Sequence, residues 1–153
     1  MPFADLHCDT IAWLRHNRRR GKAMHLRDSE PMHINLEKLQ TSGYLLQNFA
    51  LFVNLAEETD PWGAVLTLAE LYTSEVEKNR DLVTPCRTFA DLEQARADGK
   101  IAAVLTVEEG GVCKGDVENL RTLHRLGVRM LTLTWNHENE LGFPNGQSGG
   151  LKE

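Results

Sequence analysis

The sequence predicts an α/β fold in which parallel strands alternate with helices. Two observations lead to this prediction. Nearly continuous apolar runs rich in β-favouring residues recur along the chain, as in strands that are buried on both faces. Helical segments with recognisable first and last residues separate these runs. Such alternation is typical of βα units, in which helices cover a parallel sheet.

Four strands are expected, each followed by a turn or helix signal. They lie near residues 3–8, 44–53, 101–107 and 128–134. The second, which contains "YLLQNFALFV", and the third, "IAAVLTV", are almost entirely apolar. These two segments are therefore predicted to be buried strands.

Helices are expected in the connections between the strands. The clearest one begins at Asp60 and Pro61, because aspartate caps helix N-termini and proline suits the first helical turn. Thr88 and Gly99 mark the start and the stop of another. Three further helical segments are expected within residues 10–21, 34–43 and 115–127.

The length of 153 residues fits one domain of ordinary size. Four parallel strands are enough for a doubly wound sheet. A (β/α)-barrel needs about eight strands and typically about 250 residues, so this chain supplies only half of one. Both architectures are open on these features alone.

The charge pattern argues against nucleic-acid and membrane partners. The net charge is −5, with no extended basic field of the kind that binds phosphates. The single basic run, Arg18 to Arg20, is interpreted as a solvated helix end. No segment approaches the roughly 18 consecutive apolar residues of a membrane-spanning helix.

The cysteines and the N-terminal segment point to a cytoplasmic protein. The three cysteines form no CxxC pair, so a disulfide framework is not expected and a reducing compartment is the simpler interpretation. The first residues lack the apolar segment of a secretory signal.

The stretch "ADLHCDT" places three ionisable side chains on alternate residues at the end of the first strand. Asp5, His7 and Asp9 would then project from one face. An imidazole nitrogen and a carboxylate oxygen that reach one point suit zinc or a similar divalent ion, with Asp5 available to orient His7. The alternative is a strand end that faces water, with an aspartate that caps the next helix.

The stretch "TVEEGG" follows the third strand, at the edge where catalytic groups of parallel α/β folds gather. Glu109 is the candidate to bridge two cations, with one oxygen on each. The two glycines are expected to let the backbone turn sharply and to keep space open above the carboxylate. The alternative is a turn in which Glu108 and Glu109 both face water. Because neighbours alternate on a strand, one of the two is expected to point outward.

The fourth strand ends at Trp135, Asn136 and His137, which form a third group of candidates at the same edge. No P-loop, dinucleotide-binding glycine pattern or serine nucleophile elbow is present to suggest another chemistry.

Together, "DLHCDT", "TVEEGG" and "LRTLHRLGVRMLTLTWNHENELG" resemble the membrane dipeptidase (renal dipeptidase-like) metallopeptidases of the amidohydrolase superfamily. The resemblance implies a (β/α)-barrel of the metal-dependent hydrolase type, with His7, Asp9 and the bridging Glu109 as metal ligands. It implies two zinc ions that share a bridging hydroxide, which attacks the amide carbonyl of a dipeptide. Zinc and a dipeptide are thus the expected cofactor and substrate.

The sequence departs from the family pattern at Trp135, where many members carry a substrate-contacting histidine. His137, two residues later, is the candidate to take over that catalytic role. Trp135 and Asn136 are then candidate substrate contacts.

The resemblance also implies that residues 1–153 form a single incomplete domain, the N-terminal half of a TIM-like barrel with about its first four βα units. The family's two further histidine ligands, a carboxylate-binding arginine and an acidic base come from later strands. A complementing C-terminal half or a second copy of the chain is therefore the expected partner, unless the sequence itself is incomplete.

Two other functions are open. One is a non-catalytic fragment that acts only as an assembly or binding module. The other is a small doubly wound domain whose strand-end acids bind magnesium for phosphate-ester chemistry, with helices over both faces of an open sheet.

Overall fold

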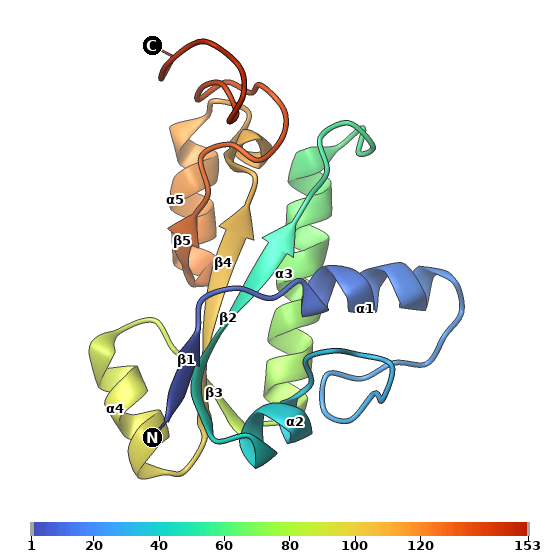
Figure 1. Cartoon of the computed structure of the whole chain (residues 1–153), viewed down its shortest axis with the longest axis vertical. Coiled ribbons are helices and arrows are strands. Elements are labelled where there is room, and N and C mark those ends of the chain that lie inside the picture. Colours follow the sequence, from blue (N-terminus) through green and yellow to red (C-terminus); the bar gives the residue numbers. More distant parts are fainter. Residues whose placement is uncertain (1, 153) are drawn as a thin grey trace.

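The computed structural model describes residues 2–152 and contains a sheet of five strands, all paired in parallel (Figure 1). The strands are β1 (Phe3–Asp5), β2 (Tyr44–Phe52), β3 (Val83–Pro85), β4 (Ile101–Glu108) and β5 (Val128–Leu131). The four strands expected from the sequence are present, and β3 is an additional short one. Two expected boundaries are wrong, because β1 ends at Asp5 rather than at residue 8 and β5 ends at Leu131 rather than at residue 134.

The strand order distinguishes the two architectures that the sequence left open. β1, β2, β4 and β5 lie side by side in chain order. β3 and β5 share one edge of β4, since Val83 pairs with Ile101 at its start and Leu131 pairs with Val107 at its end. A doubly wound sheet reverses its strand order at a switch point, whereas a barrel does not. The order therefore fits a segment of a barrel, and the described strands show no switch point of the kind that the doubly wound alternative requires.

In the part of the chain that the structure describes, five α-helices and one short 3₁₀ helix lie in the connections between strands. They are α1 (Thr10–Arg19), α2 (Leu36–Thr41), α3 (Pro61–Lys78), α4 (Phe89–Ala97), η1 (Gly110–Cys113) and α5 (Val117–Leu126). The cap predictions are confirmed: Asp60 accepts a hydrogen bond from the Gly63 N–H, and Thr88 forms a reciprocal capping box with Asp91. Within residues 2–152, no helix is long and apolar enough to cross a membrane.

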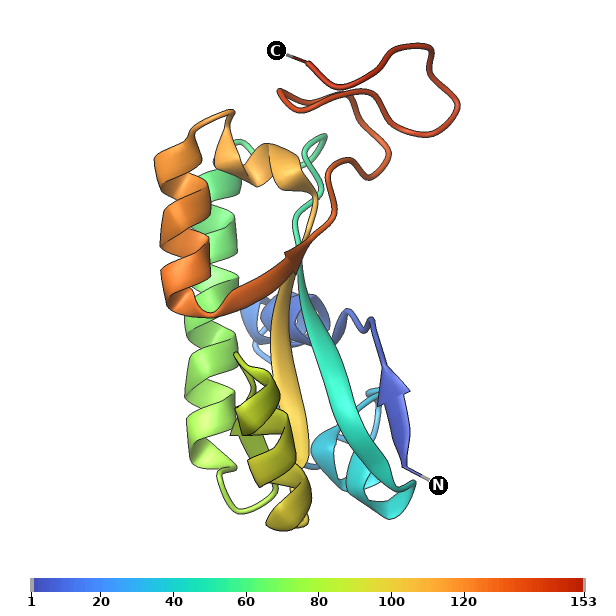
Figure 2. The same ribbon diagram turned by 90° about the vertical axis from the view of Figure 1, so that its left-hand side faces the viewer.

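The main hydrophobic core lies between the sheet and the helices α1, α2 and α3. The buried residues Phe49 and Leu51 of β2, with Leu105 and Val107 of β4, face this core. Figure 2 shows α3 and α5 along one side of the sheet. Because β-strand side chains alternate, the residues between them face the other way.

The opposite face of the sheet is covered at one end. Ala102 and Val104 of β4 pack with Leu92 and Ala95 of α4 near the amino ends of the strands. At the carboxyl ends, the same face carries Phe52 paired with Glu108. This end of the sheet is where polar side chains gather.

Candidate metal centre

His7, Asp9 and Glu108 form a compact group beyond the carboxyl ends of β1 and β4. One ligand atom from each lies within 4.8 Å of the others. The His7 Nε2 atom is 3.1 Å from the Glu108 Oε2 atom and 3.5 Å from the Asp9 Oδ2 atom. One imidazole nitrogen with two carboxylate oxygens is a donor set that zinc accepts.

Local structure explains how these three side chains meet. Glu108 is the last residue of β4, where the strand alternation directs it to the face that also carries Phe52. His7 lies in the turn between β1 and α1, where its backbone N–H donates to the Asp5 Oδ1 atom at 3.2 Å. Asp9 occupies the N-cap position of α1 but its side chain caps nothing, so its carboxylate stays available to the group.

Asp5, which was expected to orient His7, contacts the backbone of His7 and not its ring. The Asp5 carboxylate contacts the His7 backbone, and no hydrogen bond joins it to the imidazole in the described part of the chain. Asp5 therefore fixes the path of the turn that carries His7. The ring itself is placed by Asp9 and Glu108.

The electrostatics of the group favour a bound cation. Burial raises the pKa of the Glu108 carboxyl; the nearby His7 lowers it, while Asp9 and Glu109 raise it further. The Glu108 side chain is 16% exposed, whereas those of His7 and Asp9 are 46% and 57% exposed. Two carboxylates thus lie beside one imidazole in a place that solvent can reach. A divalent ion would stabilise this arrangement because its charge offsets the repulsion between the carboxylates.

Glu109, the predicted bridging ligand, does not join this group. Its side chain is fully buried, and its two oxygens accept hydrogen bonds from the N–H groups of Gly111 (3.0 Å) and Trp135 (3.2 Å) and from the Asn139 amide. The backbone φ of Glu109 is +90°, in a region that residues with a side chain rarely adopt. In the structure, the carboxylate beside His7 and Asp9 therefore belongs to Glu108, and not to Glu109 as expected.

The two glycines of "EEGG" also differ from expectation. The space next to them is filled by residues 132–142, hereafter the 132–142 loop. A Cβ atom on Gly110 would lie 2.8 Å from the Leu133 carbonyl oxygen, and one on Gly111 would lie 2.9 Å from Asn139 Cβ. The glycines thus allow the loop to pack closely, and the sharp turn occurs at Glu109 instead.

The candidates after the fourth predicted strand lie in the 132–142 loop. The Trp135 ring packs edge-on against Phe52 at 4.8 Å between centroids, and the His137 ring lies 6.1 Å from that of Trp135. Asn136 is exposed. None of the three joins the ligand group among residues 2–152, but Trp135 contacts Phe52, the strand partner of Glu108.

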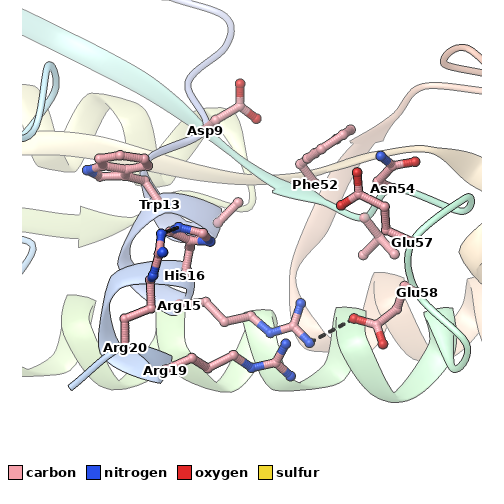
Figure 3. Close-up of a pocket in the computed structure, with 12 residues that line it drawn as sticks. Asp9, Trp13, Arg15, His16, Arg19, Arg20, Phe52, Asn54, Glu57 and Glu58 are labelled. Carbon is pink, nitrogen blue, oxygen red and sulfur yellow. Dashed lines mark hydrogen bonds and ion pairs between the residues drawn. The ribbon is translucent and has the colours of Figure 1, made fainter. Parts of the chain in front are cut away.

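A cleft of about 660 Å³ begins at Asp9 and runs between α1 and the segment after β2 (Figure 3). Trp13 and Phe52 supply aromatic surface, and Arg19 and Arg20 supply positive charge. The Arg15 guanidinium, also in the wall, pairs with Glu58 at 3.1 Å.

The basic run forms the end of α1, as expected, and Arg19 and Arg20 are exposed there. The same two arginines line the cleft, whereas Arg18 pairs with the buried Glu75 at 2.8 Å. The residues that form the cleft come from segments about 40 residues apart in the chain, such as Arg15 and Glu58. No local pattern in the sequence indicates that they meet.

The cysteine between the two N-terminal ligand candidates is buried in the core. Cys8 lies in the main core, and burial raises the pKa of its thiol to about 11. A thiol with so high a pKa carries almost no thiolate at neutral pH.

Comparisons with known proteins agree with the fold and the motifs. A dipeptidase described as a metallopeptidase of family M19 superposes with a TM-score of 0.83 at 22% identity, over 94% of this chain and 45% of that one. A metallopeptidase from Rhodobacter sphaeroides, liganded with a phosphinate mimic of the dipeptide L-Ala-D-Ala, gives 0.81 at 20% identity, over 94% and 48%. An amidohydrolase from Pseudomonas aeruginosa gives 0.66 at 20% identity, over 75% and 34%.

These overlaps confirm the prediction of an α/β fold that corresponds to part of such an enzyme. The chain spans slightly less than half the length of the dipeptidase and of the Rhodobacter metallopeptidase. The family model for membrane dipeptidase matches residues 1–147, which is nearly the whole chain. The protein therefore belongs to the membrane dipeptidase family, peptidase family M19.

Proposed function

We propose that this protein contributes a zinc site to the hydrolysis of dipeptides, with His7, Asp9 and Glu108 as the ligands. The observation that carries the proposal is the approach of one imidazole and two carboxylates to within 4.8 Å at the carboxyl end of a parallel sheet. Family membership supplies the reaction class. The proposal differs from the expectation from sequence in its third ligand, which is Glu108 instead of Glu109.

The donor set fits a zinc ion. Catalytic zinc sites typically have three protein ligands drawn from histidine and carboxylates, with one position left for water or substrate. When bound, the metal polarises the scissile carbonyl and lowers the pKa of water. A second zinc ion, which the resemblance implies, would need ligands besides these three residues.

The residues of the chain supply binding and orientation around that site. Asp5 fixes the turn that presents His7, and the largely buried Glu108 is held by β4. Phe52 and Trp135 offer an aromatic wall for a substrate side chain. The cleft beside Asp9 has a volume in the range of about 300–1,000 Å³ that small-molecule sites occupy.

The proposed substrate is a dipeptide with a D-residue at its carboxyl side. A dipeptide of that kind, in the form of a phosphinate mimic, is the ligand of the Rhodobacter metallopeptidase. The position of His137 beside Trp135 supports a role for this histidine in substrate binding, since the two rings lie 6.1 Å apart.

We also propose that residues 1–153 are part of one barrel domain that further strands complete at β1 and β5. β1 and β5 each pair on one side only in the described structure, and open strand edges of this kind accept further strands. All three cysteines are free, which supports the expected reducing, cytoplasmic compartment.

The test combines zinc content with turnover of L-Ala-D-Ala in the protein at its natural length. The wild type should contain bound zinc and hydrolyse the peptide, and Glu108→Gln should lose both. Glu140→Gln, an exposed neighbour in the 132–142 loop, is the matched control and should retain both. A wild type that binds no zinc and shows no turnover would instead support the assembly-module alternative.

A further inference from the structure

We propose that Glu109 is a positioning residue that fixes the 132–142 loop, and with it Trp135, beside the metal group. The attachment of the loop by Glu109 does not depend on dipeptide hydrolysis. Only the effect of this attachment on substrate binding rests on the proposed function. Glu109 is the one member of the glutamate pair that the metal group does not use. Its carboxylate must therefore have another role.

The contacts of Glu109 join two parts of the chain. On its own side, the Oε1 atom accepts from the Gly111 N–H at 3.0 Å. From the loop, Oε2 accepts from the Trp135 N–H at 3.2 Å, and Oε1 accepts from the Asn139 amide. Both oxygens thus accept hydrogen bonds, and these bonds offset the cost of burying the carboxylate.

The backbone at Glu109 adapts to these contacts. Its φ of +90° lies in a region that residues with a side chain rarely adopt. Such conformations persist where the surroundings over-determine them, and they concentrate at functional sites. Here the carboxylate bonds to Gly111, Trp135 and Asn139 hold the conformation in place.

Asn139 completes the connection from the loop side. The residue is 6% exposed, and its Nδ2 donates to the Leu133 carbonyl at 2.8 Å as well as to Glu109. Its Oδ1 accepts from the N–H groups of Leu141 (2.8 Å) and Gly142 (3.2 Å). Asn139 therefore organises the loop, and Glu109 attaches the organised loop to β4.

The consequence for the site follows from Trp135. Its backbone is held by Glu109, and its ring packs on Phe52 at 4.8 Å. Phe52 pairs with Glu108 in the sheet, so the ring lies over the face that carries the metal group. Glu109 therefore sets the position of an aromatic wall that contacts the substrate, without touching the substrate or the metal.

The experiment compares Glu109→Gln with Glu140→Gln in the protein at its natural length. In glutamine, an NH₂ group replaces one of the two oxygens and cannot accept a hydrogen bond from the donors around Glu109. The 132–142 loop should therefore shift. The near-ultraviolet circular dichroism signal of Trp135, identified as the difference between wild type and Trp135→Phe, should be lost or altered in Glu109→Gln. In Glu140→Gln the signal should be unchanged.

Metal binding and kinetics distinguish a positioning role of Glu109 from a role as a metal ligand and from a purely structural role. Zinc content should stay at the wild-type level in Glu109→Gln, whereas Glu108→Gln should lose zinc. KM for L-Ala-D-Ala should rise by about 10- to 100-fold while kcat changes less, because misplacement of a binding wall reduces substrate binding first. Asn139→Ala, which removes one donor to Glu109, should shift the Trp135 signal in the same way and serves if Glu109→Gln does not fold.

Two results would overturn the proposal. One is loss of zinc in Glu109→Gln, which would make Glu109 a ligand. The other is a Trp135 signal equal to that of the wild type in both Glu109→Gln and Asn139→Ala. If the wild type does not hydrolyse the peptide, the proposed function fails, but the Trp135 signal and the zinc content still decide the role of Glu109.

Discussion

Glu108 and Glu109 are adjacent in the chain, but their side chains have opposite surroundings. Glu108 is partly exposed and faces His7, and its pKa is raised by burial with the nearby acids. Glu109 is fully buried and accepts hydrogen bonds from Gly111, Trp135 and Asn139. The two neighbours differ in their partners. Donors of the same chain bond to both Glu109 oxygens, whereas Glu108 lies beside the imidazole of His7.

Glu75 on α3 supports the same distinction. Its side chain is 1% exposed, and it accepts hydrogen bonds from the Leu26 N–H and from Arg18 and Lys78. Burial by itself would raise the pKa of Glu75, but these donors outweigh it and the net shift is downward. As in Glu109, both carboxylate oxygens of Glu75 accept hydrogen bonds from donors of the same chain.

The largest effect is expected at Glu108. Glu108→Gln should lower kcat/KM for L-Ala-D-Ala by at least about 1,000-fold, which corresponds to about 4 kcal/mol of transition-state stabilisation. The exposed Glu140→Gln should change kcat/KM by less than about twofold, in line with a substitution away from the site. Steady-state kinetics of both variants in the same zinc-containing buffer provides the measurement. Equal activity in the two variants would remove the distinction between Glu108 and the other acids.

The next largest effect is expected at Glu75, on the stability of the fold. Glu75→Ala should lower the free energy of unfolding at pH 7 by about 3 kcal/mol, because it leaves buried donors without an acceptor. Since the folded-state pKa is lowered, the contribution is present above the unfolded-state pKa of about 4.3 and is lost as pH falls through the folded value.

Urea unfolding at pH 7 and at acid pH measures this contribution. The difference between wild type and Glu75→Ala should shrink as the pH falls. A difference that stays constant with pH would mean that the Glu75 charge does not stabilise the fold.

A smaller effect is expected where the 132–142 loop packs on β4. In Gly110→Ala the new Cβ would lie 2.8 Å from the Leu133 carbonyl oxygen, so the loop must move at a cost of about 2 kcal/mol. Gly150→Ala is the matched control, since nothing lies within 4 Å of its Cβ position. Thermal unfolding of both variants gives the comparison, and equal stabilities would contradict the close packing of the loop.

The smallest effect is expected at Asp5, which contacts the His7 backbone and not its ring. Asp5→Ala should weaken zinc binding by about fivefold, equivalent to the roughly 1 kcal/mol of one hydrogen bond. Asp5→Asn keeps an acceptor oxygen and should bind zinc as the wild type does. Zinc titration of the two variants measures the effect. A loss beyond about 100-fold in Asp5→Ala would indicate that Asp5 is itself a ligand.

Much of the fold follows from local patterns in the sequence. Continuous apolar runs predicted β2 and β4, and the caps at Asp60 and Thr88 predicted two helices. The short β3 was missed, because three residues that include a proline give no periodic signal. The end of β1 was misplaced by three residues, since the turn that begins after Asp5 depends on its bond to the His7 backbone.

The site was predictable only in part. The two-residue spacing of His7 and Asp9 located two members of the group at the end of the first strand. The choice between Glu108 and Glu109 could not be made in this way, since it depends on donors from Trp135 and Asn139 that lie 26 and 30 residues away. The alternation of residues along β4 was the one local signal, and it required knowing where the strand ends.

The position of a bound zinc ion tests the central claim most directly. Anomalous X-ray scattering from crystals of the zinc-loaded protein at its natural length would locate the ion. The account predicts zinc about 2.0–2.2 Å from His7 Nε2 and from carboxylate oxygens of Asp9 and Glu108, with Glu109 still bonded to the 132–142 loop. Zinc bound to Glu109 oxygens, with Glu108 outside the coordination shell, would contradict it.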